Sequence, residues 1–174
     1  MSNSERIALF IDGQHLHHAA KSLGFGVDFK RLLFEFQRRG TIVRSYYYTT
    51  ISENADQSVH PLLDWLDYNG FTVLAKPTKE FDDSEGRRRT RRNIGVELAV
   101  DALEISDRID HLVLFSGDGG LRALVEAVQR RGVRVSVVST IRTRPPMVAD
   151  ELRRQADTFL ELDDFKASIG QPME

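Results

Sequence analysis

Two short apolar runs constrain the fold of this chain more than any other feature, because each ends in a polar loop that contains glycine. Residues 7–11 (IALFI) lead into Asp12-Gly13, and residues 111–115 (HLVLF) lead into Ser116-Gly117-Asp118. A continuous apolar run of this length is typical of a strand that is buried on both faces of a parallel sheet. The two runs therefore predict an α/β fold with helices on both faces of the sheet.

Strand and helix patterns alternate along the rest of the chain. Runs rich in β-branched and aromatic residues predict strands at 41–49, 71–75 and 133–138, and an edge strand at 158–162. Amphipathic segments predict helices through Leu16 to Leu23, from an Asp28 N-cap through Phe36, around 62–68, and over 95–107, 121–131 and 149–156. This alternation predicts a three-layer α/β/α sandwich with a mainly parallel sheet. We expect one domain over residues 1–165 and a frayed tail over residues 166–174.

The composition excludes several classes of site. The chain has 174 residues, with 24 Lys and Arg, 26 Asp and Glu, and no cysteine. The absence of cysteine excludes disulfides, Cys-ligated metals and a thiol nucleophile. No apolar run approaches the roughly 20 residues of a membrane span, and the polar start MSNSER is unlike a signal peptide. We therefore expect a cytoplasmic protein with no membrane partner. The net charge of −2 argues against a uniformly basic surface but leaves room for a local basic patch.

Asp12 and Asp118 lie in the loops immediately after the two buried strands. In open α/β sheets the carboxyl ends of the strands form the crevice where sites lie, so we expect both carboxylates in one crevice. Carboxylates there would bind Mg²⁺ or Mn²⁺, which can orient a water for attack on a phosphodiester. The alternative is that each aspartate caps the helix that follows it.

Four segments of the chain carry a resemblance to a known family. They are IALFIDGQHL, RRNIGVELAVDAL, LVLFSGDGGLRALVEAVQRRGVRVSVVS and ADELRRQADTFLEL. In this order they resemble the NYN, or LabA-like, family of PIN-like proteins, over nearly the whole chain. The resemblance implies a PIN-like α/β/α sandwich, an acidic cluster that holds a divalent metal, and RNA cleavage or processing.

The chain departs from the family pattern at three positions. His15 stands where the family has Asn, and Gly95 and Gly120 stand where it has Asp. By the resemblance, two of four acidic ligands remain, namely Asp12 and Asp118. Two carboxylates make a poor Mg²⁺ site unless phosphates and waters complete the octahedron.

Two other residues are candidates to compensate for the missing acids. Asp101 matches the aspartate of the family's LAVD motif, although Glu97, Asp101 and Glu104 share one helix face that is more typical of a solvated surface. His15 is a candidate metal ligand or general base, and its alternative role is a hydrogen bond to the backbone.

A dense arginine run follows the third predicted strand, inside a charged segment (76–93) that predicts a long loop or an exposed hairpin. Its members are Arg87, Arg88, Arg89, Arg91 and Arg92. Arginine suits phosphate oxygens, so the run predicts salt-dependent, sequence-independent RNA binding. The alternative is a solvated turn neutralised by its own acids, Glu80, Asp82, Asp83 and Glu85. Tyr46, Tyr47 and Tyr48 could stack on bases, but they alternate faces in a strand, which predicts one or two of them in the core.

Two functions remain open from the sequence. One is an NYN protein related to metal-dependent ribonucleases that processes or binds RNA. Its acidic site would be incomplete and its catalysis weak or lost, and an active form would bind Mg²⁺ or Mn²⁺ weakly. The other is a non-catalytic pseudo-nuclease that serves as a protein-interaction or regulatory module, with no cofactor. RNA is the expected partner. A protein partner and a homodimer remain open.

Overall fold

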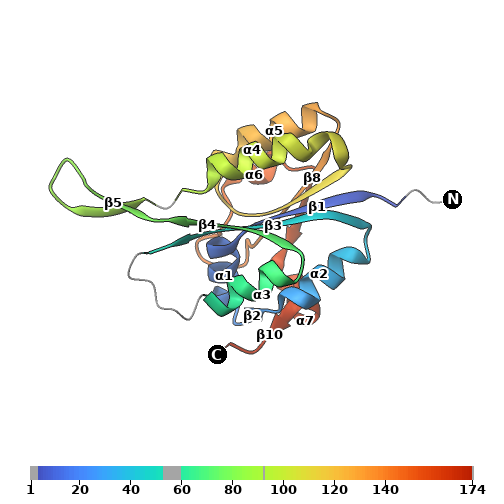
Figure 1. Cartoon of the computed structure of the whole chain (residues 1–174), viewed down its shortest axis with the longest axis horizontal. Helices are drawn as coiled ribbons and strands as arrows, with labels where there is room; N and C mark the ends of the chain where they lie inside the picture. The colour runs from blue at the N-terminus through green and yellow to red at the C-terminus, as the bar shows by residue number, and fades with distance from the viewer. Residues whose placement is uncertain (1–3, 53–59, 92, 174) are drawn as a thin grey trace.

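A six-stranded parallel sheet forms the centre of the computed structural model, which describes residues 4–52, 60–91 and 93–173 (Figure 1). Its strands, from one edge to the other, are β4 (Phe71–Pro77), β3 (Thr41–Ile51), β1 (Arg6–Asp12), β7 (His111–Phe115), β8 (Arg134–Ser139) and β9 (Thr158–Glu161). Every neighbouring pair is parallel. The predicted α/β sandwich and its edge strand near 158–162 are confirmed.

Helices cover both faces of the sheet (Figure 1). One layer holds α1 (Gly13–Ser22), α2 (Phe29–Gln37), α3 (His60–Tyr68) and α7 (Lys166–Ile169). The other holds α4 (Gly95–Ile105), α5 (Arg122–Arg130) and α6 (Asp150–Gln155). Short 3₁₀ turns lie at Ser106–Arg108, Gly119–Leu121 and Leu162–Phe165. As predicted, Asp28 caps α2 by accepting the backbone N–H groups of Lys30 and Arg31.

The alternation of side chains along β1 divides the core into two clusters. Ile7, Leu9 and Ile11 pack with α1, α2 and α3, whereas Ala8 and Phe10 pack with α4 and α5. All five side chains are fully buried, which explains why this part of the sequence is an uninterrupted apolar run. The neighbouring tyrosines obey the same alternation: Tyr47 joins the first cluster and Tyr48 the second, and both are buried as predicted.

The C-terminal segment is ordered, so the predicted frayed tail over 166–174 is wrong for residues 166–171. Ile169 in α7 is buried in the first core cluster, and β10 (Gly170–Gln171) pairs with β2 (Gly26–Val27). Arg31 fixes the segment further, because its guanidinium donates to the carbonyl oxygens of Ala167 and Gly170 at 2.6 Å each. The burial of one isoleucine and the capping of the carbonyls together hold a segment that is too short to form a helix alone.

The charged segment between β4 and α4 forms an exposed hairpin, one of the two predicted forms. Its strands, β5 (Lys79–Asp82) and β6 (Arg88–Arg91), pair with each other and project from the body of the molecule (Figure 1). Asp83 closes the turn by accepting the backbone N–H groups of Glu85 and Arg87. Gly86 has a φ of +77°, a conformation that favours glycine. Among the helices that the structure describes, none combines the length and apolar character needed to cross a bilayer.

Candidate functional site

A pocket of about 180 Å³ opens at the carboxyl ends of β1 and β3, beside the loop that follows β7. The order of the sheet explains this location, because β1 lies between β3 and β7 and all three strands run in the same direction. The pocket is lined by Asp12, Gln14, His15, Thr49, Thr50, Asn93, Ile94, Gly95, Asp118 and Leu121. The two strand-end aspartates thus share one pocket.

Asp12 lies at the end of β1 and caps α1. One carboxylate oxygen accepts the backbone N–H of His15 at 3.3 Å, and the other accepts the hydroxyl of Ser116 at 3.2 Å. Burial raises the pKa of Asp12 above its ordinary value, although these two hydrogen bonds oppose the shift. The charge of Asp118 raises that pKa further, since two carboxylates near one another resist joint ionisation.

Asp118 caps the 3₁₀ turn that precedes α5. Its Oδ1 accepts the backbone N–H of Gly120 at 2.8 Å. Ser116 joins the two aspartates, because its oxygen accepts the backbone N–H of Asp118 at 3.3 Å while its hydroxyl donates to Asp12. Both aspartates therefore act as caps, the alternative open from the sequence, and both also line the pocket.

His15 lines the pocket and is hydrogen-bonded to Ser139, the last residue of β8. The hydroxyl of Ser139 donates to the carbonyl oxygen of Met147 at 3.1 Å, so its oxygen accepts from Nε2–H of His15 at 2.8 Å. Nδ1 is then the unprotonated nitrogen. Burial, aided by the charge of His18, lowers the pKa of His15 to about 4. The imidazole is therefore neutral at physiological pH, and its Nδ1 can accept a hydrogen bond.

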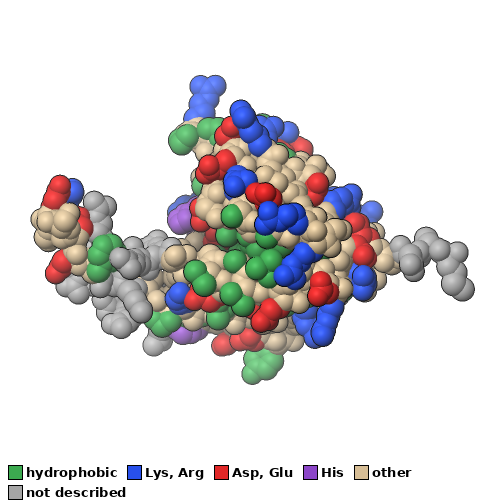
Figure 2. All heavy atoms as spheres, turned by 90° about the horizontal axis from the view of Figure 1, so that it is seen from above, with side chains coloured by type: hydrophobic (Ala, Val, Ile, Leu, Met, Phe, Trp, Pro, Cys, Tyr) green, Lys and Arg blue, Asp and Glu red, His purple; other side chains and the backbone are tan. Residues whose placement is uncertain are grey.

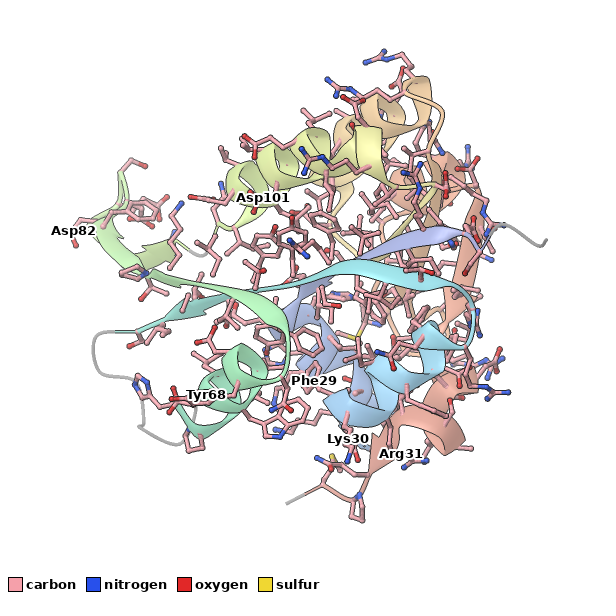
Figure 3. All side chains as sticks on the ribbon, turned by 45° about the vertical axis from the view of Figure 1, so that its right-hand side comes forward. Phe29, Lys30, Arg31, Tyr68, Asp82 and Asp101 are labelled. Atoms are coloured by element: carbon pink, nitrogen blue, oxygen red, sulfur yellow. The ribbon has the colours of Figure 1, made fainter. Side chains whose placement is uncertain are left out.

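Asp101 does not line the pocket. It accepts the hydroxyl of the buried Tyr48 at 2.7 Å and lies on the side of α4 that faces the sheet (Figure 3). Glu97, on the same helix, pairs with Lys76 of β4 at 2.6 Å, and Glu104 is exposed. The acidic stripe of α4 thus has structural partners at two positions and solvent at the third, and the structure does not bring it to the aspartate pair.

Comparison with known proteins identifies the family. The model of the NYN domain matches residues 6–163. The chain belongs to the NYN family. It is 35% identical over 168 residues to the low amplitude and bright protein LabA of Synechococcus elongatus, covering 94% of this chain and 87% of the relative. It is also similar to the crystal structure of a protein of unknown function from Vibrio parahaemolyticus, with a TM-score of 0.77, 25% identity, and coverage of 98% of this chain and 99% of the other.

Gly95 and Gly120, the two positions where the family resemblance predicts acids, have only side-chain atoms near the place of a Cβ. Gly95 lines the pocket with Asp12 and Asp118, and a Cβ there would lie 3.2 Å from Asn93 Oδ1 and 3.9 Å from Leu121. A Cβ at Gly120 would lie 3.2 Å from Asp118 Oδ1. Neither contact is with backbone, and neither glycine has a positive φ. A Cβ at either position therefore requires only a small shift of a neighbouring side chain.

The pocket does not fit a divalent metal by itself. Within the described ranges, no group of three or more His, Asp or Glu side chains is placed to hold an ion. Asp12 already accepts from His15 and Ser116, and Asp118 accepts from Gly120. A hard cation such as Mg²⁺ needs about six oxygen ligands. Asp12 and Asp118 already cap helices, so most of the coordination shell of such an ion would have to come from other groups.

Four neutral polar residues of the pocket were missed by sequence reasoning: Gln14, Thr49, Thr50 and Asn93. Gln14 Nε2 donates to Thr50 Oγ1 at 2.7 Å, and Asn93 Oδ1 accepts the backbone N–H of Gly95 at 2.9 Å. Gln14 adjoins Asp12 in the sequence and could have been suspected. Thr50 could not, because its place depends on β3 lying beside β1.

The arginine run lies on and beside β6. Arg87 pairs with Asp83 at 3.4 Å and with Glu85, so this residue follows the neutralised-turn alternative. The structure describes the backbone but not the side chains of Arg88, Arg89 and Arg91, and Arg92 lies outside the described residues. The hairpin leads directly into the pocket, since Asn93 and Gly95 follow β6 within four residues.

Proposed function

We propose that this NYN protein binds RNA and is related to metal-dependent ribonucleases, while its own cleavage activity is weak or lost. One observation carries the proposal: Gly95 lines the same pocket as Asp12 and Asp118, with space but no carboxylate at that position. Removing a group that stabilises charge in the transition state commonly costs about 100-fold or more in rate. A pocket that lacks such a group at Gly95 would lose catalysis before it loses its binding surfaces.

The remaining lining suits the binding of a nucleotide. Gln14, Thr49, Thr50 and Asn93 offer neutral donors and acceptors of the kind that pair with base edges and ribose hydroxyls. The neutral His15 offers an acceptor nitrogen to such a ligand. The adjoining arginine-rich hairpin supplies the positive charge that a polyanion requires.

The experiment compares binding and cleavage of labelled single-stranded RNA in the presence of Mn²⁺. The proteins are the wild type, Asp12→Asn, the double variant Gly95→Asp/Gly120→Asp, and the uncharged control Gly95→Asn/Gly120→Asn. We expect binding by all four proteins and a gain in cleavage of about 100-fold in the aspartate double variant alone. Wild-type cleavage that Asp12→Asn abolishes would instead establish a competent nuclease. Absence of RNA binding by the wild type would refute the proposal.

A protein-interaction module is the second candidate, and an exposed apolar strip on α4 favours it. Val96 and Val100 lie one helical turn apart with 65% and 49% of their surface exposed. Figure 2 looks onto this helical layer and shows apolar side chains gathered among charged ones. Sedimentation of the wild type beside Val96→Ser/Val100→Ser tests self-association through this strip. A lighter species in the variant would support a homodimer.

A further inference from the structure

The pairing of β5 with β6 gives the hairpin two chemically different faces. In an antiparallel pair, residues directly opposite each other lie on the same face, and successive residues alternate faces. Lys79 is opposite Arg91, and Phe81 is opposite Arg89. These four residues therefore share one face, which we call the basic face. The other face holds two further pairs, Glu80 opposite Thr90 and Asp82 opposite Arg88.

The charges of the two faces differ in sign. The basic face carries three cationic residues and one aromatic residue and has no acid. The other face carries two acids and one arginine. The arginine run therefore does not act as one uniform patch. Its first member, Arg87, already pairs with Asp83 and Glu85, and the second, Arg88, lies opposite an acid.

We propose that the basic face, formed by Lys79, Phe81, Arg89 and Arg91, is the surface on which single-stranded RNA lies as it approaches the pocket. Cationic residues beside an aromatic ring are the combination that single-strand binders use, since the cations contact phosphates and the ring stacks on a base. Phe81 is 37% exposed, so part of its ring surface is accessible. The inference rests on the proposed function, because it names the surface by which the same site takes its substrate.

The root of the hairpin connects this face to the pocket. Thr78, just before β5, donates its backbone N–H to the carbonyl oxygen of Ile51 at 2.9 Å, next to the pocket residue Thr50. On the other side, β6 ends two residues before the pocket residue Asn93. The ion pair of Lys76 with Glu97 at 2.6 Å joins the chain before the hairpin to the helix after it. A single-stranded RNA bound along the hairpin would therefore reach the pocket.

The far end of the hairpin lies away from the body of the molecule. Asp82, the last residue of β5, lies near the tip, well separated from Asp101 on α4 (Figure 3). Figure 2 shows the same arm extending beyond the globular part. Most of the described side chains near the tip are exposed, among them Phe81, Asp82 and Arg87.

Two double variants with the same change in charge test the inference. Arg89→Ser/Arg91→Ser removes two arginines from the basic face, whereas Arg87→Ser/Arg88→Ser removes two that lie next to acids. Binding of labelled poly(U) is measured by fluorescence anisotropy at several salt concentrations. We expect Arg89→Ser/Arg91→Ser to weaken binding about 10-fold or more and to lower the salt slope by about 1.4, since each phosphate contact on a single strand contributes about 0.7. We expect Arg87→Ser/Arg88→Ser to weaken binding by a clearly smaller factor, because Arg87 is paired with Asp83 and Glu85 and Arg88 lies opposite Asp82.

A second pair of variants tests the aromatic residue. Phe81→Leu keeps the apolar character but removes the ring, and Phe81→Tyr keeps the ring. We expect about a 5-fold or greater loss of affinity in the first and little change in the second, because stacking requires a π-face. Circular dichroism checks that each variant keeps the secondary structure of the wild type.

The outcomes separate this inference from the function on which it rests. Equal losses in the two arginine variants would overturn the basic face while leaving RNA binding intact. No binding of poly(U) by the wild type would refute the proposed function itself. Binding of poly-glutamate, but not poly(U), through Arg89 and Arg91 would overturn the inference in favour of an acidic protein partner.

Discussion

Gly117 illustrates how closely the two loops of the pocket approach each other. A Cβ at this position would lie 1.8 Å from the carbonyl oxygen of Met147 and 2.7 Å from the ring of His15. The backbone of Gly117 also accepts the N–H of Ala149 at 2.9 Å. The loop after β7 and the loop after β8 therefore pack backbone to backbone, and a side chain between them would push His15 away from Ser139.

We predict that Gly117→Ala destabilises the protein by about 2 kcal/mol or more, because the neighbouring backbone cannot yield to the methyl group. Gly95→Ala is the matched control: its Cβ would contact side-chain atoms of Asn93 and Leu121 rather than backbone, so we expect a change within about 1 kcal/mol. Urea unfolding of both variants beside the wild type measures the difference. Equal stability of the two variants would contradict the close approach.

His111 gives a prediction for the effect of pH on stability. Burial lowers its pKa below the ordinary value of 6.5, and the nearby Arg134 lowers it further while Glu5 opposes the shift. Its ring also bonds to Ser136 at 2.7 Å. As pH falls below about 6.5, the unfolded imidazole takes up a proton that the folded one does not, so stability falls. The loss stops once pH passes below the folded pKa.

The measurement is the free energy of unfolding in urea at about pH 7 and about pH 5. We expect His111→Gln to lose less stability over this interval than the wild type, because the variant has no imidazole to titrate at this position. The other histidines are common to both proteins and cancel in the comparison. An identical pH dependence in the two proteins would show that His111 is not the source.

At the scale of elements, the C-terminal segment contributes to the core despite its short length. Ile169 is 1% exposed and packs in the cluster that contains α1 and α2. We predict that Ile169→Ala costs about 2–4 kcal/mol in unfolding free energy, the range for a buried isoleucine. Met173, with 51% of its surface exposed, provides the control, and Met173→Ala should change stability by less than about 0.5 kcal/mol. A loss no larger in Ile169→Ala than in Met173→Ala would mean that the tail is dispensable.

The elements that could be predicted from the sequence are those whose burial is complete. β1 and β7 are apolar at every central position because both faces are covered, and the caps at Asp12 and Asp28 mark where helices begin. The sequence mispredicts the segment after Asp164 because Phe165 and Ile169 are the only large apolar residues before Met173, spaced one turn apart among mostly polar neighbours. Its order depends on contacts with α2, which no local pattern reveals.

The site shows the same division between local and tertiary information. Asp12 and Asp118 could be placed together because parallel strands bring their carboxyl ends to one edge. The hydroxyl of Ser116 that joins them, and Thr50 from β3, could not be assigned without knowing which strands are neighbours. Asp101 matched the family motif, yet the structure shows it bonded to Tyr48, since β3 passes beneath α4.

At the scale of the whole molecule, the hairpin segment (residues 79–92, the arm) and the rest of the chain (the body) carry net charges of opposite sign. Residues 79–92 contain six basic and four acidic residues, a net charge of +2 within a chain of net charge −2. The body therefore carries a net charge of −4 and would repel RNA at long range, whereas the arm attracts it. On the proposed function, this separation predicts that the hairpin contributes most of the electrostatic attraction to RNA.

We also expect the body of the protein to fold without the arm. Among the strands that the structure describes, β5 and β6 pair only with each other, and Lys79 lies opposite Arg91, so the two ends of the hairpin are close in space. We predict that a Gly-Ser linker of about four residues in place of residues 79–91 lowers the melting temperature by no more than a few degrees, because no core residue is removed. The same variant should lose nearly all binding of single-stranded RNA at physiological salt, measured by anisotropy. Unfolding of the variant would show that the arm supports the body, and unchanged binding would assign RNA contact to another surface.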